Sequence, residues 1–228
     1  MLQRQHNKIM AKYIETLKKA PLFYGFDDDE IEKALQCMNA RCLKYEKEEM
    51  IIQEGNIVND IGILLSGHAQ SIKQDTSGKI SIITLLKPGS FIGILLAASA
   101  NRKSPVSVQA KEQLSVLFIP IKNIIFGYAK NFPKYNILLQ NYISAIAEKA
   151  LVLHDRNDCL IKPTVREKVL TYLKRAAKEK ESNTFTIPLD RNGMAEYINV
   201  ERSALSRELS RMKKDGLIDY YKNSFKLL

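Results

Sequence analysis

The sequence predicts an α+β protein that begins with an antiparallel β-roll, continues with a long helix and ends with a winged helix-turn-helix. Three observations predict this order. Glycines separate short apolar runs in residues 41–121, a helical period of apolar residues follows Pro133, and two short helices and a hairpin pattern end the chain. Each pattern has the spacing of one type of element. We therefore expect a β-roll with N-terminal helices at 1–132, a long helix at 133–160 and a winged helix-turn-helix at 161–228.

The roll follows a helical lead-in. Acidic residues 27–29 favour the start of a helix over 30–38, because carboxylates stabilise helix N-termini. Six of the ten glycines then fall in residues 41–121, the segment that holds the apolar runs. Glycine adopts positive φ without strain, so this spacing predicts tight turns in a compact antiparallel roll. The clearest strand candidates are 50–52, 61–65, 80–86 and 115–119.

The long helix carries a heptad pattern, in which apolar residues recur at alternating gaps of four and three. A single Asn within three heptads favours a parallel two-stranded coiled coil, since a buried Asn selects register and oligomer state. The alternative is one amphipathic helix that packs on its own roll. The predicted homodimer seam consists of Leu139, Ile143, Ile146, Ala150, Leu153 and Asn157, followed by Leu160.

The chain changes direction after this helix. Residues 158–163 end in a proline and predict a break that serves as a hinge, and Thr164 and Glu167 have the spacing of a capping box for a helix over 165–180. A short strand is expected at 184–187.

The last segment predicts a helix-turn-helix. A short helix at 194–198, a tight turn and a helix at 202–214 ended by Gly216 have the required spacing, and strands at 217–221 and 225–228 would form the wing. The second helix can enter the roughly 12 Å wide major groove of DNA. Short hydroxyl side chains beside arginines suit close approach to such a surface. The alternative interpretation is a basic helix face that is only exposed to solvent. The predicted DNA-binding residues are Arg202, Ser203, Ser206, Arg207 and Arg211.

Composition and charge agree with a globular protein that has an acidic partner. The 228 residues are 45% hydrophobic and 26% charged, and the net charge is +10. Residues 160–228 hold fifteen Lys and Arg and nine Asp and Glu, a balance of +6, so the C-terminal segment is the basic one. The apolar stretches at 91–98 and 116–121 are shorter than the roughly 18 residues of a membrane span, and no secretory signal follows residues 4–8. We expect a cytoplasmic protein with no membrane partner.

Cysteines and histidines do not form a metal or redox pattern. Cys37, Cys42 and Cys159 match neither CxxC nor zinc spacing, and they are too few for an iron–sulfur cluster, which needs about four ligands. His68 and His154 are candidate haem ligands, but a lone histidine is more often structural. We predict no cofactor and no metal.

Two motif regions support a family resemblance. LSREL at 205–209 and KDGLI at 214–218, together with PGSFIG at 88–93, resemble the cyclic AMP receptor protein and fumarate-nitrate regulator (CRP/FNR) family of bacterial transcription regulators. The resemblance implies a cyclic-nucleotide-binding-like jelly roll, sequence-specific binding to a palindromic operator in double-stranded DNA, a small-molecule effector, and RNA polymerase as a candidate partner. It makes Arg207 the family arginine that reads guanine or contacts the backbone. Ser203 departs from the Glu that many members use to read cytosine.

The sensing region departs from the cyclic-nucleotide pattern. Members that bind cyclic AMP carry a Glu directly after Phe-x-Gly and an Arg about ten residues later, and these positions here are Ile94 and Ser104, with Arg102 and Lys103 as shifted substitutes. Losing a buried acceptor costs roughly 1–3 kcal/mol, so cyclic AMP is disfavoured. The apolar run at 92–96 would suit a hydrophobic effector or form ordinary core. The predicted effector pocket consists of Gly89, Phe91, Gly93, Ile94, Leu95, Lys103 and Ser104.

Two other classes of function make different predictions. A ligand sensor that acts through protein contacts would show a weaker salt dependence than a DNA-binding protein, because phosphate neutralisation releases counterions. An enzyme lacks support, since the sequence contains no P-loop, HExxH or GxSxG motif. We predict that the protein is not an enzyme.

Overall fold

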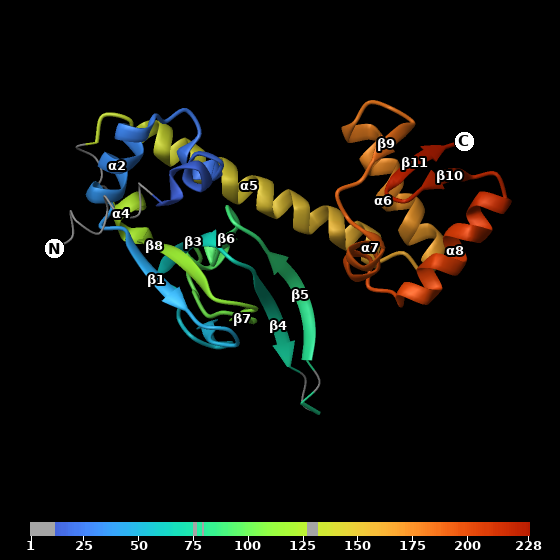
Figure 1. Cartoon of the computed structure of the whole chain (residues 1–228), viewed down its shortest axis with the longest axis horizontal. Coiled ribbons are helices and arrows are strands. Elements are labelled where there is room, and N and C mark those ends of the chain that lie inside the picture. Colours follow the sequence, from blue (N-terminus) through green and yellow to red (C-terminus); the bar gives the residue numbers. More distant parts are fainter. Residues whose placement is uncertain (1–11, 75–76, 79, 127–131) are drawn as a thin grey trace. The chain divides into compact units, whose positions relative to one another are not determined.

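The chain forms two compact units, divided between Lys149 and Ala150 (Figure 1). Each unit has its own buried core, and the long helix α5 (Tyr135–Leu160) contributes residues to both cores. Among the described helices, none combines the length and hydropathy of a membrane span. The computed structural model describes residues 12–74, 77–78, 80–126 and 132–228.

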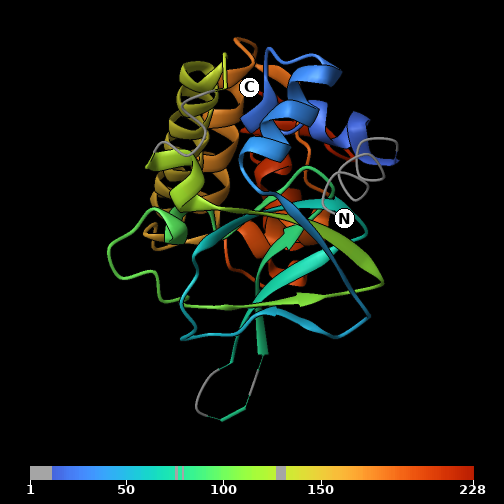
Figure 2. The ribbon, with the colours of Figure 1, turned by 90° about the vertical axis from the view of Figure 1, so that its left-hand side faces the viewer.

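Two four-stranded sheets form the β-roll of the first unit. All strand pairs of this unit in the described residues are antiparallel, which confirms the predicted roll. The hairpin of β4 (Ala69–Gln74) and β5 (Ile80–Leu86) extends from the body of the roll (Figure 2). One sheet has the order β1-β8-β3-β6, with bounds Arg41–Tyr45, Leu114–Pro120, Asp60–Ser66 and Phe91–Ile92. The other has the order β2-β7-β4-β5, with bounds Met50–Ile52, Ser107–Ala110, Ala69–Gln74 and Ile80–Leu86.

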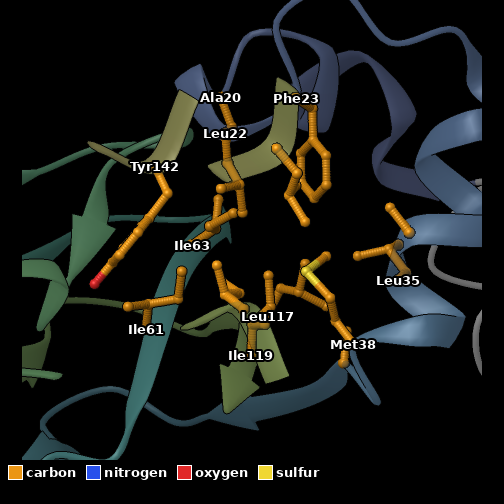
Figure 3. Close-up of a cluster of buried hydrophobic side chains, with 14 of the residues drawn as sticks. Ala20, Leu22, Phe23, Leu35, Met38, Ile61, Ile63, Leu117, Ile119 and Tyr142 are labelled. Atoms are coloured by element: carbon orange, nitrogen blue, oxygen red, sulfur yellow. The ribbon is translucent and has the colours of Figure 1, made fainter. Parts of the chain in front are cut away.

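Strand β8 is buried on both faces. Val116 and Phe118 lie in the cluster inside the roll, whereas Leu117 and Ile119 lie in the cluster that includes the N-terminal helices. Figure 3 shows this second cluster, with Leu117 and Ile119 among side chains from the N-terminal segment, β3 and α5. A strand covered on both sides needs apolar residues at successive positions, which explains the unbroken run in this strand.

The N-terminal segment contains the 3₁₀-helix η1 (Pro21–Phe23) and helix α2 (Asp28–Cys37). The predicted helix at 30–38 is displaced, because Asp27 forms the N-cap. Its side chain accepts a 2.9 Å bond from the Glu30 amide, and the Glu30 carboxylate accepts a 2.9 Å bond from the Asp27 amide. This reciprocal capping starts the helix two residues before the predicted position. Two further short helices of this unit are α3 (Ile94–Ala97) and α4 (Ile121–Ile125).

The long helix was correctly predicted, but the break after it was placed too early. Helix α5 continues through Asp158 and Cys159, and it ends at Leu160. Cys159 is fully buried in the core of the second unit, which holds the last turn in place. The expected hinge at 158–163 therefore lies inside the second unit, and its role as a hinge stays a prediction.

The second unit is a winged helix-turn-helix, as predicted. Its core includes Leu173, Met194 and Leu209, none of which is exposed to solvent. Thr164 and Glu167 form the expected capping box. The helices are α6 (Val165–Glu179), α7 (Arg191–Tyr197) and α8 (Arg202–Lys214), and the sheet has the order β10-β11-β9, with bounds Ile218–Tyr221, Ser224–Leu227 and Thr184–Thr186.

Small differences from the predicted boundaries have local causes. Helix α7 starts at Arg191 rather than 194, because the Asp190 carboxylate accepts a 2.7 Å bond from the Gly193 amide and caps the helix. Helix α8 has the predicted bounds. The α6 helix and the strands of this unit end within a residue of their expected limits.

Candidate DNA interface and sensing region

Helix α8 separates an apolar face from a polar one. Leu205, Leu209 and Met212 are fully buried. Among the predicted DNA-binding residues, the structure leaves Arg202, Ser203, Arg207 and Arg211 exposed and Ser206 half-buried. The arrangement can present guanidinium and hydroxyl groups to a groove while the buried face fixes the helix on its unit.

A forked ion pair holds this helix on α6. The Nε of Arg166 lies 2.6 Å from Glu208 Oε1, and its Nη2 lies 2.7 Å from Asp215 Oδ2. The two carboxylates raise the pKa of the Arg166 guanidinium above its ordinary value. Glu208 also lies 3.6 Å from Arg211 Nη1. The Glu208 carboxylate therefore pairs with Arg166 of α6, although Glu208 directly follows Arg207 in the sequence.

The turn between α7 and α8 is short and well bonded. Asn199 has a φ of 52°, a left-handed conformation that asparagine tolerates better than most residues. The Val200 amide donates a 3.0 Å bond to the Ala195 carbonyl, and Ile198 is fully buried. The turn thus fixes the orientation of α8 relative to α7.

Sequence reasoning missed Arg191, which anchors the wing. Its Nη2 donates a 3.1 Å bond to the Lys222 carbonyl at the tip of the hairpin. Its guanidinium also lies 5.2 Å from the ring centroid of Tyr220 and 5.6 Å from that of Phe225. Burial lowers the pKa of Arg191. The wing is therefore attached to the first residue of α7.

The motif of the sensing region forms a tight turn on the roll. Gly93 has a φ of 71°, and a Cβ there would lie 2.8 Å from Val58 Cγ1, so a larger residue would strain the backbone and clash. Gly89 also has positive φ, at 87°, while Phe91 and Leu95 are half-buried. Ile94 is only 3% exposed and belongs to the core, where its carbonyl accepts a 3.4 Å bond from the Tyr142 hydroxyl.

Ser104 has internal partners. It is 3% exposed, and its hydroxyl donates a 2.6 Å bond to the Val106 carbonyl. Lys103 is exposed nearby, and Arg102 Nη1 donates a 3.0 Å bond to Asn59 Oδ1. A hollow of about 160 Å³ lies beside this loop, and the predicted effector-pocket residues are absent from its lining. Its walls are Ile51, Ile52, Asn56, Ile57, Val58, Asn59, Asp60 and Phe118.

Helix α5 carries two sets of apolar side chains. One set packs in the core of the roll unit, and the other set forms the predicted seam. Leu138, Tyr142 and Ala145 are buried in the core of the roll unit. Two residues of the predicted seam, Leu139 and Ile146, pack partly against that core. The other seam positions are more open: Ile143 is 57% and Leu153 is 47% exposed, Ala150 and Asn157 are exposed, and Leu160 is half-buried.

Of the histidines that the structure describes, His68 belongs to the first unit and His154 to the second. His68 is exposed, and its Nδ1 lies 2.6 Å from Glu112 Oε1. His154 groups with Asp155 and Asp158 on α5, but Asp155 also pairs with Arg175 at 3.3 Å. Burial raises the pKa of the Cys159 thiol, which keeps that group protonated.

Comparisons with known proteins match both units. Residues 42–127 match the cyclic nucleotide-binding domain, and residues 167–228 match the Crp-like helix-turn-helix domain. The regulatory protein HlyX of Actinobacillus pleuropneumoniae is 26% identical over 182 residues, which cover 76% of this chain and 72% of HlyX. The transcriptional activator protein Anr of Pseudomonas protegens is 25% identical over 227 residues, 94% of this chain and 87% of Anr.

Solved structures share the fold. The c-di-GMP-responsive global regulator CLP of Xanthomonas campestris superposes with a TM-score of 0.57 at 16% identity, over 88% of this chain and 99% of CLP. A CooA variant from Carboxydothermus hydrogenoformans gives a TM-score of 0.54 at 17% identity, over 84% of this chain and 85% of that one. The relatives are transcription regulators and not enzymes. With a cyclic nucleotide-binding domain followed by a DNA-binding helix-turn-helix, the chain belongs to the CRP/FNR family of transcription regulators.

Proposed function

We propose that the protein reads a palindromic operator with helix α8, through Arg202, Ser203, Ser206, Arg207 and Arg211. The observation that carries the proposal is the division of α8 into a fully buried apolar face and an exposed face with three arginines. A bidentate arginine contact to guanine discriminates between bases by roughly 1–3 kcal/mol. Arg207, at the family position for this contact, is expected to contribute most to specificity.

The proposed active form is a homodimer. The exposed apolar side chains of Ile143 and Leu153 lie on the seam and would be covered by the same helix of a second copy. Such a pairing would place two reading helices about 34 Å apart, which matches the half-sites of a palindrome. In this proposal, residues 1–132 sense the effector, 133–160 dimerise and 161–228 bind DNA.

The proposed effector is a small molecule other than cyclic AMP, bound at the roll near Gly89, Phe91, Gly93, Leu95 and Lys103. Ile94 supports this proposal, because a buried isoleucine cannot accept the bond from a ribose hydroxyl. Ser104 supports it as well, because its hydroxyl is bonded to the Val106 carbonyl and carries no positive charge for a cyclic phosphate. RNA polymerase is a candidate partner at the promoter.

Fluorescence anisotropy on duplexes tiled upstream of the protein's own coding region tests the DNA proposal. We expect saturable binding to one inverted repeat, steep salt dependence and a loss of roughly 10- to 100-fold in Arg207→Ala. Lys178→Ala is the matched control, because it removes one positive charge from the last turn of α6 and should leave specificity unchanged. Weak binding that is equal for all duplexes and for Arg207→Ala would favour a sensor that acts through protein contacts.

A further inference from the structure

The last turns of α5 belong to the DNA-reading unit. The second unit begins at Ala150, within the helix. Cys159 is fully buried in the same core as Leu173 and Met194. The final part of the proposed dimerisation helix is therefore packed on the helices that present the reading surface.

Arg156 bonds the end of α7 directly. Its Nε donates a 3.0 Å bond to the Tyr197 carbonyl, and its Nη2 donates a 3.1 Å bond to the Glu196 carbonyl. These carbonyls lie in the last turn of α7, where a cation opposes the negative end of the helix dipole; the Glu196 carbonyl also accepts a 3.2 Å bond from the Asn199 amide. The guanidinium also lies 5.7 Å from the Tyr197 ring centroid. Arg156 thus supplies a C-terminal cap for α7 from another helix.

Arg175 makes a second link among the same three helices. From α6 it lies 3.3 Å from Asp155 of α5, and its Nη1 donates a 3.1 Å bond to the Tyr197 hydroxyl of α7. The guanidinium lies 5.9 Å and 5.8 Å from the ring centroids of Tyr172 and Tyr197. Burial raises the pKa of Tyr197, so its hydroxyl stays protonated near neutral pH.

We propose that Arg156 is a positioning residue for DNA reading, which holds α7 on the end of α5 and thereby sets the orientation of α8. The turn from Ile198 to Glu201 transmits this orientation, because Ile198 is buried and Val200 is bonded back to Ala195. A rotation of the two paired α5 helices would then move both reading helices with them. The inference rests on the proposed reading role of α8.

Arg156→Met tests the proposal in the full-length protein on the operator duplex and on an unrelated duplex. We expect the operator affinity to fall roughly tenfold, the effect of losing about 1.4 kcal/mol. The affinity for the unrelated duplex and the salt slope should stay unchanged, because no phosphate contact is lost. Arg156→Lys should recover part of the operator affinity, since one ammonium group can bond only one of the two carbonyls well.

Two controls separate positioning from charge and from folding. Lys162→Met removes one positive charge near the end of α5 and leaves the α7 contacts in place, so operator affinity should stay at the wild-type value. Asp155→Asn removes the carboxylate charge that pairs with Arg175, which is a smaller change than the loss of Arg156. It should weaken operator binding roughly threefold with the same salt slope. Amide hydrogen exchange should rise in residues 191–197 of Arg156→Met and stay constant in residues 165–179.

Two results would overturn the inference. Wild-type operator affinity in both Arg156→Met and Asp155→Asn would show that the links do not position α8. Equal losses on both duplexes with a shallower salt slope would show that Arg156 contacts phosphate instead. A wild-type protein with no operator preference would overturn the DNA-reading proposal itself, which distinguishes that failure from the failure of this inference.

Discussion

The dimer seam offers the sharpest quantitative test, through Ile143→Ala. Ile143 is 57% exposed in a single chain, and the substitution removes three of its carbons. At about 0.8 kcal/mol for each buried carbon, covering that exposed fraction contributes about 1.4 kcal/mol per chain and about 2.7 kcal/mol for two chains. The dimer Kd should therefore rise about 100-fold.

Sedimentation velocity over a concentration series measures this Kd. Ile57→Ala is the matched control, because Ile57 is 63% exposed on the roll and lies off the seam. The control should keep the wild-type Kd, since the same carbons are removed from a surface that stays wet. Equal dimer Kd values for both variants would refute the assignment of the seam. Operator binding by Ile143→Ala should also depend more steeply on protein concentration than wild-type binding, because dimerisation is then coupled to binding.

Three further predictions concern the second unit, one tyrosine of the core and the break after α5. Arg166→Met should reduce the ratio of operator to non-specific affinity, because Glu208 and Asp215 lose the cation that orients α8. Binding titrations on the two duplexes measure this ratio. An unchanged ratio would contradict the role of Arg166 in orienting α8. Burial raises the pKa of Tyr142 from 10.0 to about 12, so its contribution to the free energy of unfolding is present below pH 10 and is lost as pH rises toward 12. Thermal denaturation between pH 9 and 12 should show a smaller decline for Tyr142→Phe, and an identical decline would count against it. Pro163→Ala should change operator affinity less than twofold, as measured by anisotropy, because Arg156 and Arg175 link α5, α6 and α7 on both sides of the break. A larger loss of affinity would support a hinge at 158–163.

The elements with strong local signals were predicted well. Helix α8 has the expected bounds, since apolar residues at helical spacing precede a terminating Gly216. Strands β2 and β5 also coincide with apolar runs. Strands β1, β4, β6 and β7 were not predicted. Strands β6 and β7 have only two and four residues, which carry too little periodicity to be distinguished from a loop, and β1 and β4 mix polar with apolar residues instead of forming an apolar run.

The parts that sequence reasoning missed depend on contacts between distant residues. Arg166 and Glu208 are 42 positions apart, and only the packing of α6 on α8 brings them together. The inner face of α5 was missed for a related reason: Tyr142 adjoins the seam residue Ile143, so two apolar stripes overlap on one helix. Gly193 obscured the start of α7, because glycine disfavours helices while the Asp190 cap stabilises this one.

The boundary between the two units lies inside a continuous helix, and this limits how the protein can be divided or recombined. A fragment that starts at residue 161 would keep the reading helices but lose Cys159 from their core and Arg156 from the end of α7. A fragment that starts at Ala150 would retain both. A chimera with a relative should for the same reason exchange chains at Ala150 and not at the end of the helix. The helical turns from Ala150 to Leu160 thus belong with the DNA-binding module, although they continue the helix of the sensing module.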